Sequence, residues 1–191
     1  MQRREPLMFM LQLAMFGSGL LFLGLLLAYA GILERHAEGF SSVQVPLTFW
    51  ASTLAIVLSS MTLYLAKINF NEEKFAAYRT YAGATLFLGI CFVVLQIMGG
   101  FDLFALNHRG QYRSSRGFVY LISAVHVLHI VMGIAFLIKL FIEALRRTSY
   151  LDSFVYAVNP PNQRRIAMMI YYWHFVDVLW LILFAFMLTY M

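Results

Sequence analysis

Residues 172–184 read YWHFVDVLWLILF, a run of aromatic and aliphatic side chains that includes one histidine and one carboxylate. The run lies in an apolar stretch near the end of the chain that is long enough to cross a membrane as a helix. Asp177 is the only Asp or Glu within any apolar stretch. Because an ionised carboxylate in the middle of a lipid-facing helix costs about 2.5–3.5 kcal/mol, we expect Asp177 to face protein or to stay protonated. His174 and Trp180, each three positions from Asp177, lie on the same side of the helix.

The composition is that of an integral membrane protein. Hydrophobic residues make up 62% of the chain and charged residues 12%, whereas soluble domains carry about 25% charged residues. The charges fall in short gaps between long apolar stretches, so no soluble domain fits between them. We therefore predict a single domain, residues 1–191, with an all-α fold of five transmembrane helices at about 7–33, 45–67, 78–100, 117–141 and 166–190. The first stretch is longer than the core of a secretory signal, which has about 7–15 residues, and is predicted to be a transmembrane helix.

The distribution of Lys and Arg predicts the orientation of the chain. One side of the predicted membrane holds Arg3, Arg4, Lys67, Lys74, Arg79, Lys139, Arg146, Arg147, Arg164 and Arg165. The other side holds Arg35, Arg109, Arg113 and Arg116. The positive-inside bias places the N-terminus in the cytoplasm and the C-terminus outside. Because these cations lie beside membrane ends, the net charge of +5 indicates contact with lipid headgroups and not with nucleic acid.

Small and polar residues indicate how the helices pack. Ala51, Ala55 and Ser59 follow one another at four-residue spacing, which lets a second helix approach closely. That helix belongs either to this bundle or to another subunit. Gln96 is a further hydrogen-bonding group within the membrane. In the fourth loop, Pro160-Pro161 is expected to stop any helix before the last span begins near Ile166.

Four ionisable residues within the spans are candidates for a functional site. His126 and His129 share one face of the fourth helix, and His174 and Asp177 have the same spacing on the fifth. The loop that joins these helices has fewer than thirty residues, so the two faces can meet. We favour a structural polar cluster in which His126 or His129 pairs with Asp177. Imidazoles from two helices could instead bind a haem, as His126 or His129 together with His174, and a third alternative is a small proton carrier built on Asp177.

Other kinds of active site find little support in the sequence. Cys91 is the only cysteine, which excludes an intrachain disulfide and a thiolate cluster. The methionines are scattered and are expected to fill the core. The chain has no glycine-rich phosphate loop, no Ser-His-Asp order and no paired carboxylates. We therefore assign no catalytic residue, no metal ligand and no cofactor-binding residue to this chain.

Two motifs resemble a known family. The sequence from Trp173, WHFVDV followed by Trp180, resembles the final-helix signature of subunit III of the haem–copper oxidases, the cytochrome c oxidase subunit 3 family. The sequence SAVHVLHIVMG, residues 123–133, is similar to the preceding helix of that family, with paired histidines followed by a glycine. The resemblance covers residues 117–190 most closely. The earlier helices agree in number and order with the short, five-helix bacterial form of this subunit.

The resemblance implies an accessory subunit of a proton-pumping terminal oxidase that reduces oxygen to water. Such a subunit carries no redox centre, and the haem and copper lie in partner subunits. It packs against subunit I, with subunit II in the same complex, holds phospholipid and sustains proton uptake in a bacterial plasma membrane. His126, His129, Trp173, His174 and Asp177 correspond to the structural polar cluster of the family. Whether cytochrome c or quinol donates the electrons, the haem type and the lipid identity depend on other chains and are not encoded here.

The sequence departs from the family pattern in its first and third helices. Many members have an acidic residue in the first helix, where this chain has Phe16-Gly17-Ser18-Gly19. A second family acid soon after Gln96 is replaced by Gly99-Gly100. With Gly19 and its neighbours in place of an acid, a contribution of this helix to proton entry is in question.

Overall fold

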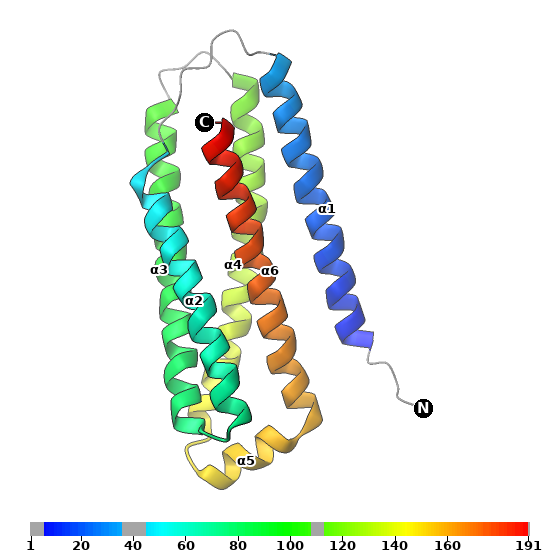
Figure 1. The fold of residues 1–191 in the computed structure, drawn as a ribbon, viewed down its shortest axis with the longest axis vertical. Coiled ribbons are helices and arrows are strands. Elements are labelled where there is room, and N and C mark those ends of the chain that lie inside the picture. Colours follow the sequence, from blue (N-terminus) through cyan, green and yellow to red (C-terminus); the bar gives the residue numbers. More distant parts are fainter. Residues whose placement is uncertain (1–5, 36–44, 108–112, 191) are drawn as a thin grey trace.

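The computed structural model describes residues 6–35, 45–107 and 113–190, which form six helices (Figure 1). They are α1 (Pro6–Arg35), α2 (Leu47–Asn71), α3 (Phe75–Asn107), α4 (Arg113–Arg146), α5 (Tyr150–Val158) and α6 (Pro160–Tyr190). All except α5 are long and apolar enough to span a membrane. The predicted all-α architecture with five spanning helices is therefore confirmed. Arg3, Arg4 and Arg109, which entered the prediction of orientation, lie outside the described residues.

The last helix begins earlier than the sequence suggested, and the loop before it contains a helix. Pro160 is the first residue of α6, although Pro160-Pro161 was expected to keep this segment non-helical until about residue 166. A proline is tolerated in the first turn of a helix because the N–H it lacks has no partner there. The short helix α5 occupies the preceding segment. The prediction that Pro160-Pro161 would keep helix out of this part of the chain was therefore wrong.

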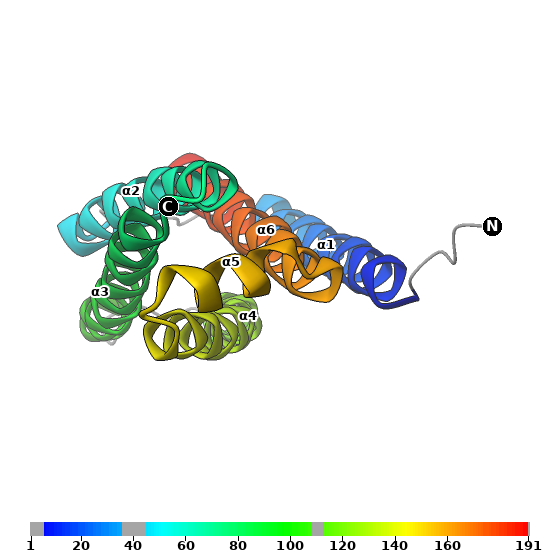
Figure 2. The same cartoon turned by 90° about the horizontal axis from the view of Figure 1, so that it is seen from below.

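The long helices run antiparallel to their neighbours in sequence (Figure 1). The N-terminal end of α1, the α2–α3 turn and α5 share one end of the bundle. Helix α2 packs most extensively on α3, and α4 packs on both α3 and α6. Seen along the bundle, α1 lies at the edge and contacts α4 and α6 (Figure 2). Helix α6 contacts α1, α2, α4 and α5, so its side chains hold the other helices together.

A network of charged and aromatic side chains fixes α5 across the end of the bundle. The Tyr156 hydroxyl donates a 2.8 Å hydrogen bond to a carboxylate oxygen of Glu143 on α4. The Arg147 guanidinium lies 3.9 Å from the centre of the Tyr156 ring, and the Arg147 carbonyl accepts hydrogen bonds from Arg79 and Ser153. Burial and the hydrogen bond to Glu143 raise the pKa of the Tyr156 hydroxyl above its usual value. Tyr156 is therefore neutral at physiological pH and acts as a donor.

The α2–α3 turn contains a residue in an unfavourable backbone conformation. Glu73 has a φ of 60°, a region that glycine usually occupies after a helix. The N–H groups of Glu73 and Lys74 donate to the carbonyls of Phe70 and Asn69, which closes the helix end. The Tyr150 hydroxyl of α5 donates a 2.8 Å hydrogen bond to the Glu73 carboxylate. This contact explains why a glutamate is accommodated where glycine is favoured.

We predict that Glu73→Gly stabilises the protein when the bond from α5 has first been removed by Tyr150→Phe. The left-handed conformation costs a non-glycine residue about 1–2 kcal/mol, and glycine loses about 0.5–1 kcal/mol more backbone entropy on folding. The expected net gain is about 0.5–1 kcal/mol, measured as a higher thermal unfolding midpoint in detergent micelles. The control is Glu72→Gly in the same background, because Glu72 has a φ of −87° and gains nothing from glycine. Equal midpoints for the two glycine variants would contradict the prediction.

Candidate functional site

Trp173 of α6 lies at the centre of the bundle and touches three other helices. Its side chain is 2% exposed, and its indole N–H donates a 3.2 Å hydrogen bond to the Ser59 hydroxyl of α2. A Cβ at Gly89 of α3 would lie 2.8 Å from the indole, and a Cβ at Gly133 of α4 would lie 3.4 Å from it. The two glycines therefore provide the space that the indole fills. Gly133, the glycine that follows the paired histidines His126 and His129, therefore leaves room for the Trp173 ring.

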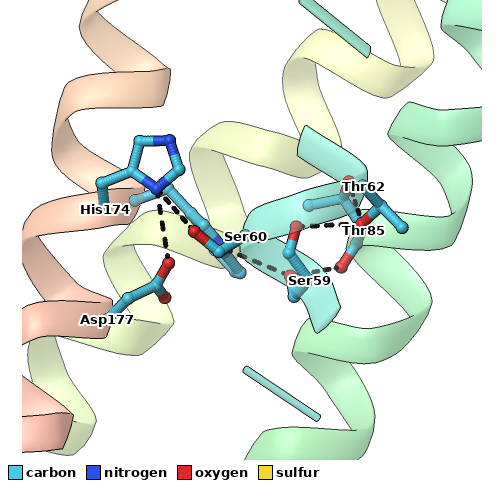
Figure 3. Close-up of polar contacts among 7 residues, drawn as sticks. Ser59, Ser60, Thr62, Thr85, His174 and Asp177 are labelled. Carbon is cyan, nitrogen blue, oxygen red and sulfur yellow. Dashed lines mark hydrogen bonds and ion pairs between the residues drawn. The ribbon is translucent and has the colours of Figure 1, made fainter. Parts of the chain in front are cut away.

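Ser59 connects Trp173 to a row of hydroxyl groups between α2 and α3 (Figure 3). The Ser59 hydroxyl donates to the carbonyl of Thr85 on α3, 3.3 Å away. The hydroxyls of Thr62 and Thr85 lie 2.9 Å apart, and Thr85 donates to the carbonyl of Tyr81. Each hydroxyl thus has a partner in an apolar environment, where an unpaired polar group is costly.

Trp180, two turns after Trp173, makes a second set of contacts. Its indole N–H donates a 3.0 Å hydrogen bond to Thr53 of α2. Its ring stacks on the imidazole of His126 on α4, with ring centres 5.6 Å apart and planes 25° apart. His126 is 2% exposed and also meets Phe22 and Phe92 edge-on. Neither ring nitrogen of His126 has a hydrogen-bond partner among the described residues, so this imidazole is held by aromatic contacts.

His129, one turn further along α4, binds the first helix. Its Nδ1 lies 2.7 Å from the carbonyl of Val125, and its Nε2 lies 2.7 Å from the Ser18 hydroxyl of α1. A carbonyl can only accept, so Nδ1 carries the hydrogen, and in the neutral ring Nε2 accepts from Ser18. The Tyr172 hydroxyl of α6 donates to the carbonyl of His129. These bonds join α1, α4 and α6 at the level of the segment Phe16-Gly17-Ser18-Gly19.

His174 and Asp177 form a third set of contacts on the side of α6 that faces α2. The His174 Nδ1 lies 2.7 Å from the Ser60 hydroxyl and 3.7 Å from the nearer Asp177 oxygen (Figure 3). The second distance is that of a charge contact and is too long for a hydrogen bond. Asp177 is buried, and neither of its oxygens has a hydrogen-bond partner in the described part of the chain.

The five residues expected to form one polar cluster are thus distributed over separate contacts. The predicted pairing of Asp177 with His126 or His129 is not the arrangement observed, because the histidine next to Asp177 is His174 of the same helix. His129 binds Ser18 instead, and His126 stacks on Trp180. The partners that sequence reasoning missed are hydroxyls, namely Ser18 for His129, Ser60 for His174 and Thr53 for Trp180. Their only signal in the sequence is a polar side chain within an apolar stretch.

The predicted row of small residues on α2, Ala51, Ala55 and Ser59, faces the interior of the bundle only in part. Ala55 and Ser59 are buried, whereas Ala51 is exposed. Ser52, one position later, is the fully buried residue at this level, and it accepts a 2.9 Å hydrogen bond from the Gln96 side chain of α3. Gln96 therefore joins α3 to α2. The buried side of α2 passes through Ser52, Ile56 and Ser59, so it is rotated away from Ala51, which was expected to be buried.

His126, His129 and His174 do not form the shared ligand pair that a haem anchor would need. His126 meets aromatic rings, His129 binds Ser18 and His174 binds Ser60. Across residues 6–35, 45–107 and 113–190, no group of three or more His, Cys, Asp or Glu side chains is placed to hold a metal ion. The chemistry of the arrangement is that of hydrogen bonding and aromatic packing between helices. Neither the haem-anchor nor the proton-carrier alternative gains support from this geometry.

Comparison with known proteins gives one family. The family model described as cytochrome c oxidase subunit III matches residues 7–191. The chain is 25% identical over 175 residues to cytochrome c oxidase subunit 3 of Bacillus sp. (strain PS3), covering 88% of this chain and 78% of that protein. It is 23% identical over 134 residues to cytochrome bo(3) ubiquinol oxidase subunit 3 of Buchnera aphidicola, covering 70% and 66%. It is 30% identical over 135 residues to a probable cytochrome c oxidase subunit 3 of Rickettsia bellii, covering 71% and 45%.

We predict that Gly89→Ala destabilises the bundle by about 1–3 kcal/mol, the usual cost of forcing an extra carbon into a packed core. The added Cβ would lie 2.8 Å from the Trp173 ring, which is itself confined by Gly133. The matched control is Gly24→Ala on α1, where nothing lies within 4 Å of the added Cβ. That variant is expected to be neutral or more stable by up to about 1 kcal/mol. Thermal unfolding in detergent, followed by tryptophan fluorescence, compares the two, and similar midpoints would contradict the role assigned to Trp173.

Proposed function

Because this chain belongs to the cytochrome c oxidase subunit III family, we propose that it is the non-redox subunit III of a respiratory haem–copper oxidase and packs directly against subunit I. The match over residues 7–191, with five spanning helices in the described chain, carries this proposal. The chain is an integral bacterial membrane protein, and its relatives are third subunits of haem–copper oxidases. Both cytochrome c and quinol oxidases occur among the relatives, so the choice of electron donor belongs to other subunits.

The contribution that we assign to this chain is structural support. The hydrogen bonds of Trp173, Trp180 and His129 each join helices of the bundle, which is a packing role. We assign the oxygen-reducing haem and copper to subunit I, with subunit II as a further partner, and no catalytic centre to this chain. The bundle then presents a rigid apolar surface to subunit I and to lipid.

Phospholipid and proton uptake belong to the same proposal. The outer side of α1 exposes apolar side chains such as Phe16, Leu20 and Leu27, which suit acyl chains. Ser18 forms a neutral hydrogen bond where many family members have an acid. Support for proton uptake in this protein therefore acts through the stability of subunit I and its lipid, and not through a titrating group on α1.

The proposed orientation has the N-terminus in the cytoplasm. The described cations Lys67, Arg79, Lys139 and Arg165 belong to the end of the bundle that also holds α5. This end would face the cytoplasm by the positive-inside bias.

We expect that selective removal of this chain from the purified native oxidase leaves the initial rate of oxygen reduction unchanged and shortens the active lifetime during turnover. Subunit I retains its redox centres but loses the packing and lipid that protect it. Oxygen consumption recorded over many turnovers measures both quantities, and adding the chain back should restore the lifetime. An unchanged lifetime would reduce the role to assembly, and the absence of oxidase subunits from the native preparation would refute the proposal.

For Asp177→Leu we expect impaired assembly and normal electron transfer in those complexes that do assemble. The substitution removes the carboxylate that lies 3.7 Å from the His174 ring on the same helix, so the imidazole loses its charged neighbour. Asp177→Asn keeps the size and polarity and serves as the control. The yield of co-purified complex and its oxygen consumption per haem measure the two effects. Normal yield for the leucine variant would show that the carboxylate is dispensable for assembly.

A further inference from the structure

His174 leaves one side of its ring open at the surface of the bundle. Its side chain is 38% exposed, although the side chain of Asp177 beside it is 8% exposed. Nδ1 points to Ser60 and Asp177, and the second ring nitrogen lies on the opposite side of the ring (Figure 3). Within the described part of the chain, Nε2 makes no hydrogen bond. A polar atom thus faces outward from the α2–α6 surface.

The position of His174 along the helices places it deep in the membrane. Arg165 precedes it by nine positions on α6, which is about 13 Å at 1.5 Å per residue. On α2, Lys67 follows Ser60 by seven positions, which is about 10 Å. Because the hydrocarbon layer is about 30 Å thick, both measurements place the imidazole near its middle. Lipid headgroups and bulk water are then out of reach of Nε2.

The ring nitrogen Nε2 needs a hydrogen-bond partner in either neutral tautomer. If Ser60 donates to Nδ1, the ring hydrogen lies on Nε2, which is then a donor. If Nδ1 carries the hydrogen and donates to Ser60, Nε2 is an acceptor. Acyl chains offer neither a donor nor an acceptor, and an unpaired polar group is costly in an apolar environment.

We propose that the α2–α6 surface around His174 is the contact surface for a transmembrane helix of another oxidase subunit, and that this helix supplies a side-chain hydroxyl that hydrogen-bonds to Nε2. A hydroxyl suits both tautomers of His174, because it can donate or accept a hydrogen bond. Tyr171 and Val178, three positions before and four after His174, are exposed on the same side of α6, and Tyr64 is exposed one turn after Ser60 on α2. They form an apolar and aromatic border around the polar contact, which excludes lipid and water from it. The inference rests on the proposed subunit role.

The first test maps the surface in the intact complex, with His174 unchanged. A photo-crosslinking amino acid is placed at Tyr64 or Val178, next to His174, and at the control positions Ile90 of α3 and Met132 of α4, which are also exposed. We expect the first two positions to crosslink to one oxidase subunit and the controls to give lipid adducts or a different neighbour. Crosslinks from Tyr64 and Val178 only to lipid, or to a second copy of this chain, would overturn the proposal.

The second test changes the imidazole itself. His174→Gln keeps a polar side chain that can donate and accept a hydrogen bond, whereas His174→Leu removes both capacities. Loss of one hydrogen bond between membrane helices, about 0.6 kcal/mol, corresponds to about threefold weaker retention of the chain in the complex. We expect this loss for the leucine variant and near-normal retention for glutamine, with thermal unfolding of the isolated chains as the folding control. Equal retention of the two folded variants refutes the His174 contact but leaves the subunit role intact, whereas failure of the unaltered chain to co-purify with any oxidase subunit refutes both.

Discussion

The packing of one indole ring of α6 against three other helices determines the geometry of this bundle. Trp173 of α6 fits against Gly89 of α3 and Gly133 of α4, and its N–H reaches Ser59 of α2. Apolar surface alone does not fix how helices associate in a membrane, because lipid tails are as apolar as the core. Shape and directional bonds must supply the specificity. A large ring that fits only where two helices lack side chains, and that ends in one directed donor, supplies both, so the positions of α2, α3 and α4 around α6 depend on it.

The polar groups of the core follow a common arrangement in which aromatic or imidazole nitrogens meet hydroxyls on a neighbouring helix. Trp173 with Ser59, Trp180 with Thr53 and His129 with Ser18 each join two helices. Hydroxyls suit this role because they are small, rotate freely and can also bond to a backbone carbonyl. Thr85 bonds in this way to the carbonyl of Tyr81 in its own helix, and Ser59 of α2 bonds to the carbonyl of Thr85 in α3. The bundle therefore satisfies most of its buried donors with weakly polar partners, which keeps the surrounding surface apolar.

The helical spans could be predicted from the sequence, since five apolar stretches of sufficient length require spanning helices in a membrane. The residues that matter around Trp173 were also identified, because a specific motif contains them. Their partners were not, since a hydroxyl such as Ser60 or Thr53 has no distinctive pattern and its contacts depend on helix rotation. Asp177 is an example. Its spacing correctly placed it on one face of the helix with His174, but the need to balance its charge suggested a partner on the neighbouring helix, which the structure does not show. Helix α5 and the early start of α6 were missed because Pro160 was interpreted as a terminator, although a proline in the first turn disturbs no helical hydrogen bond.

His129 and His174 differ in whether both ring nitrogens have hydrogen-bond partners within the bundle. Each histidine has one ring nitrogen 2.7 Å from a serine hydroxyl of another helix. For His129 the other nitrogen reaches the carbonyl of Val125 one turn earlier, so both nitrogens are satisfied within the described chain. For His174 the nitrogen nearer its own helix is taken by Ser60, with Asp177 beside it, and the remaining nitrogen faces outward. The same residue type is therefore a finished internal contact on α4 and an open one on α6, where the proposed helix of another subunit supplies the missing hydrogen-bond partner.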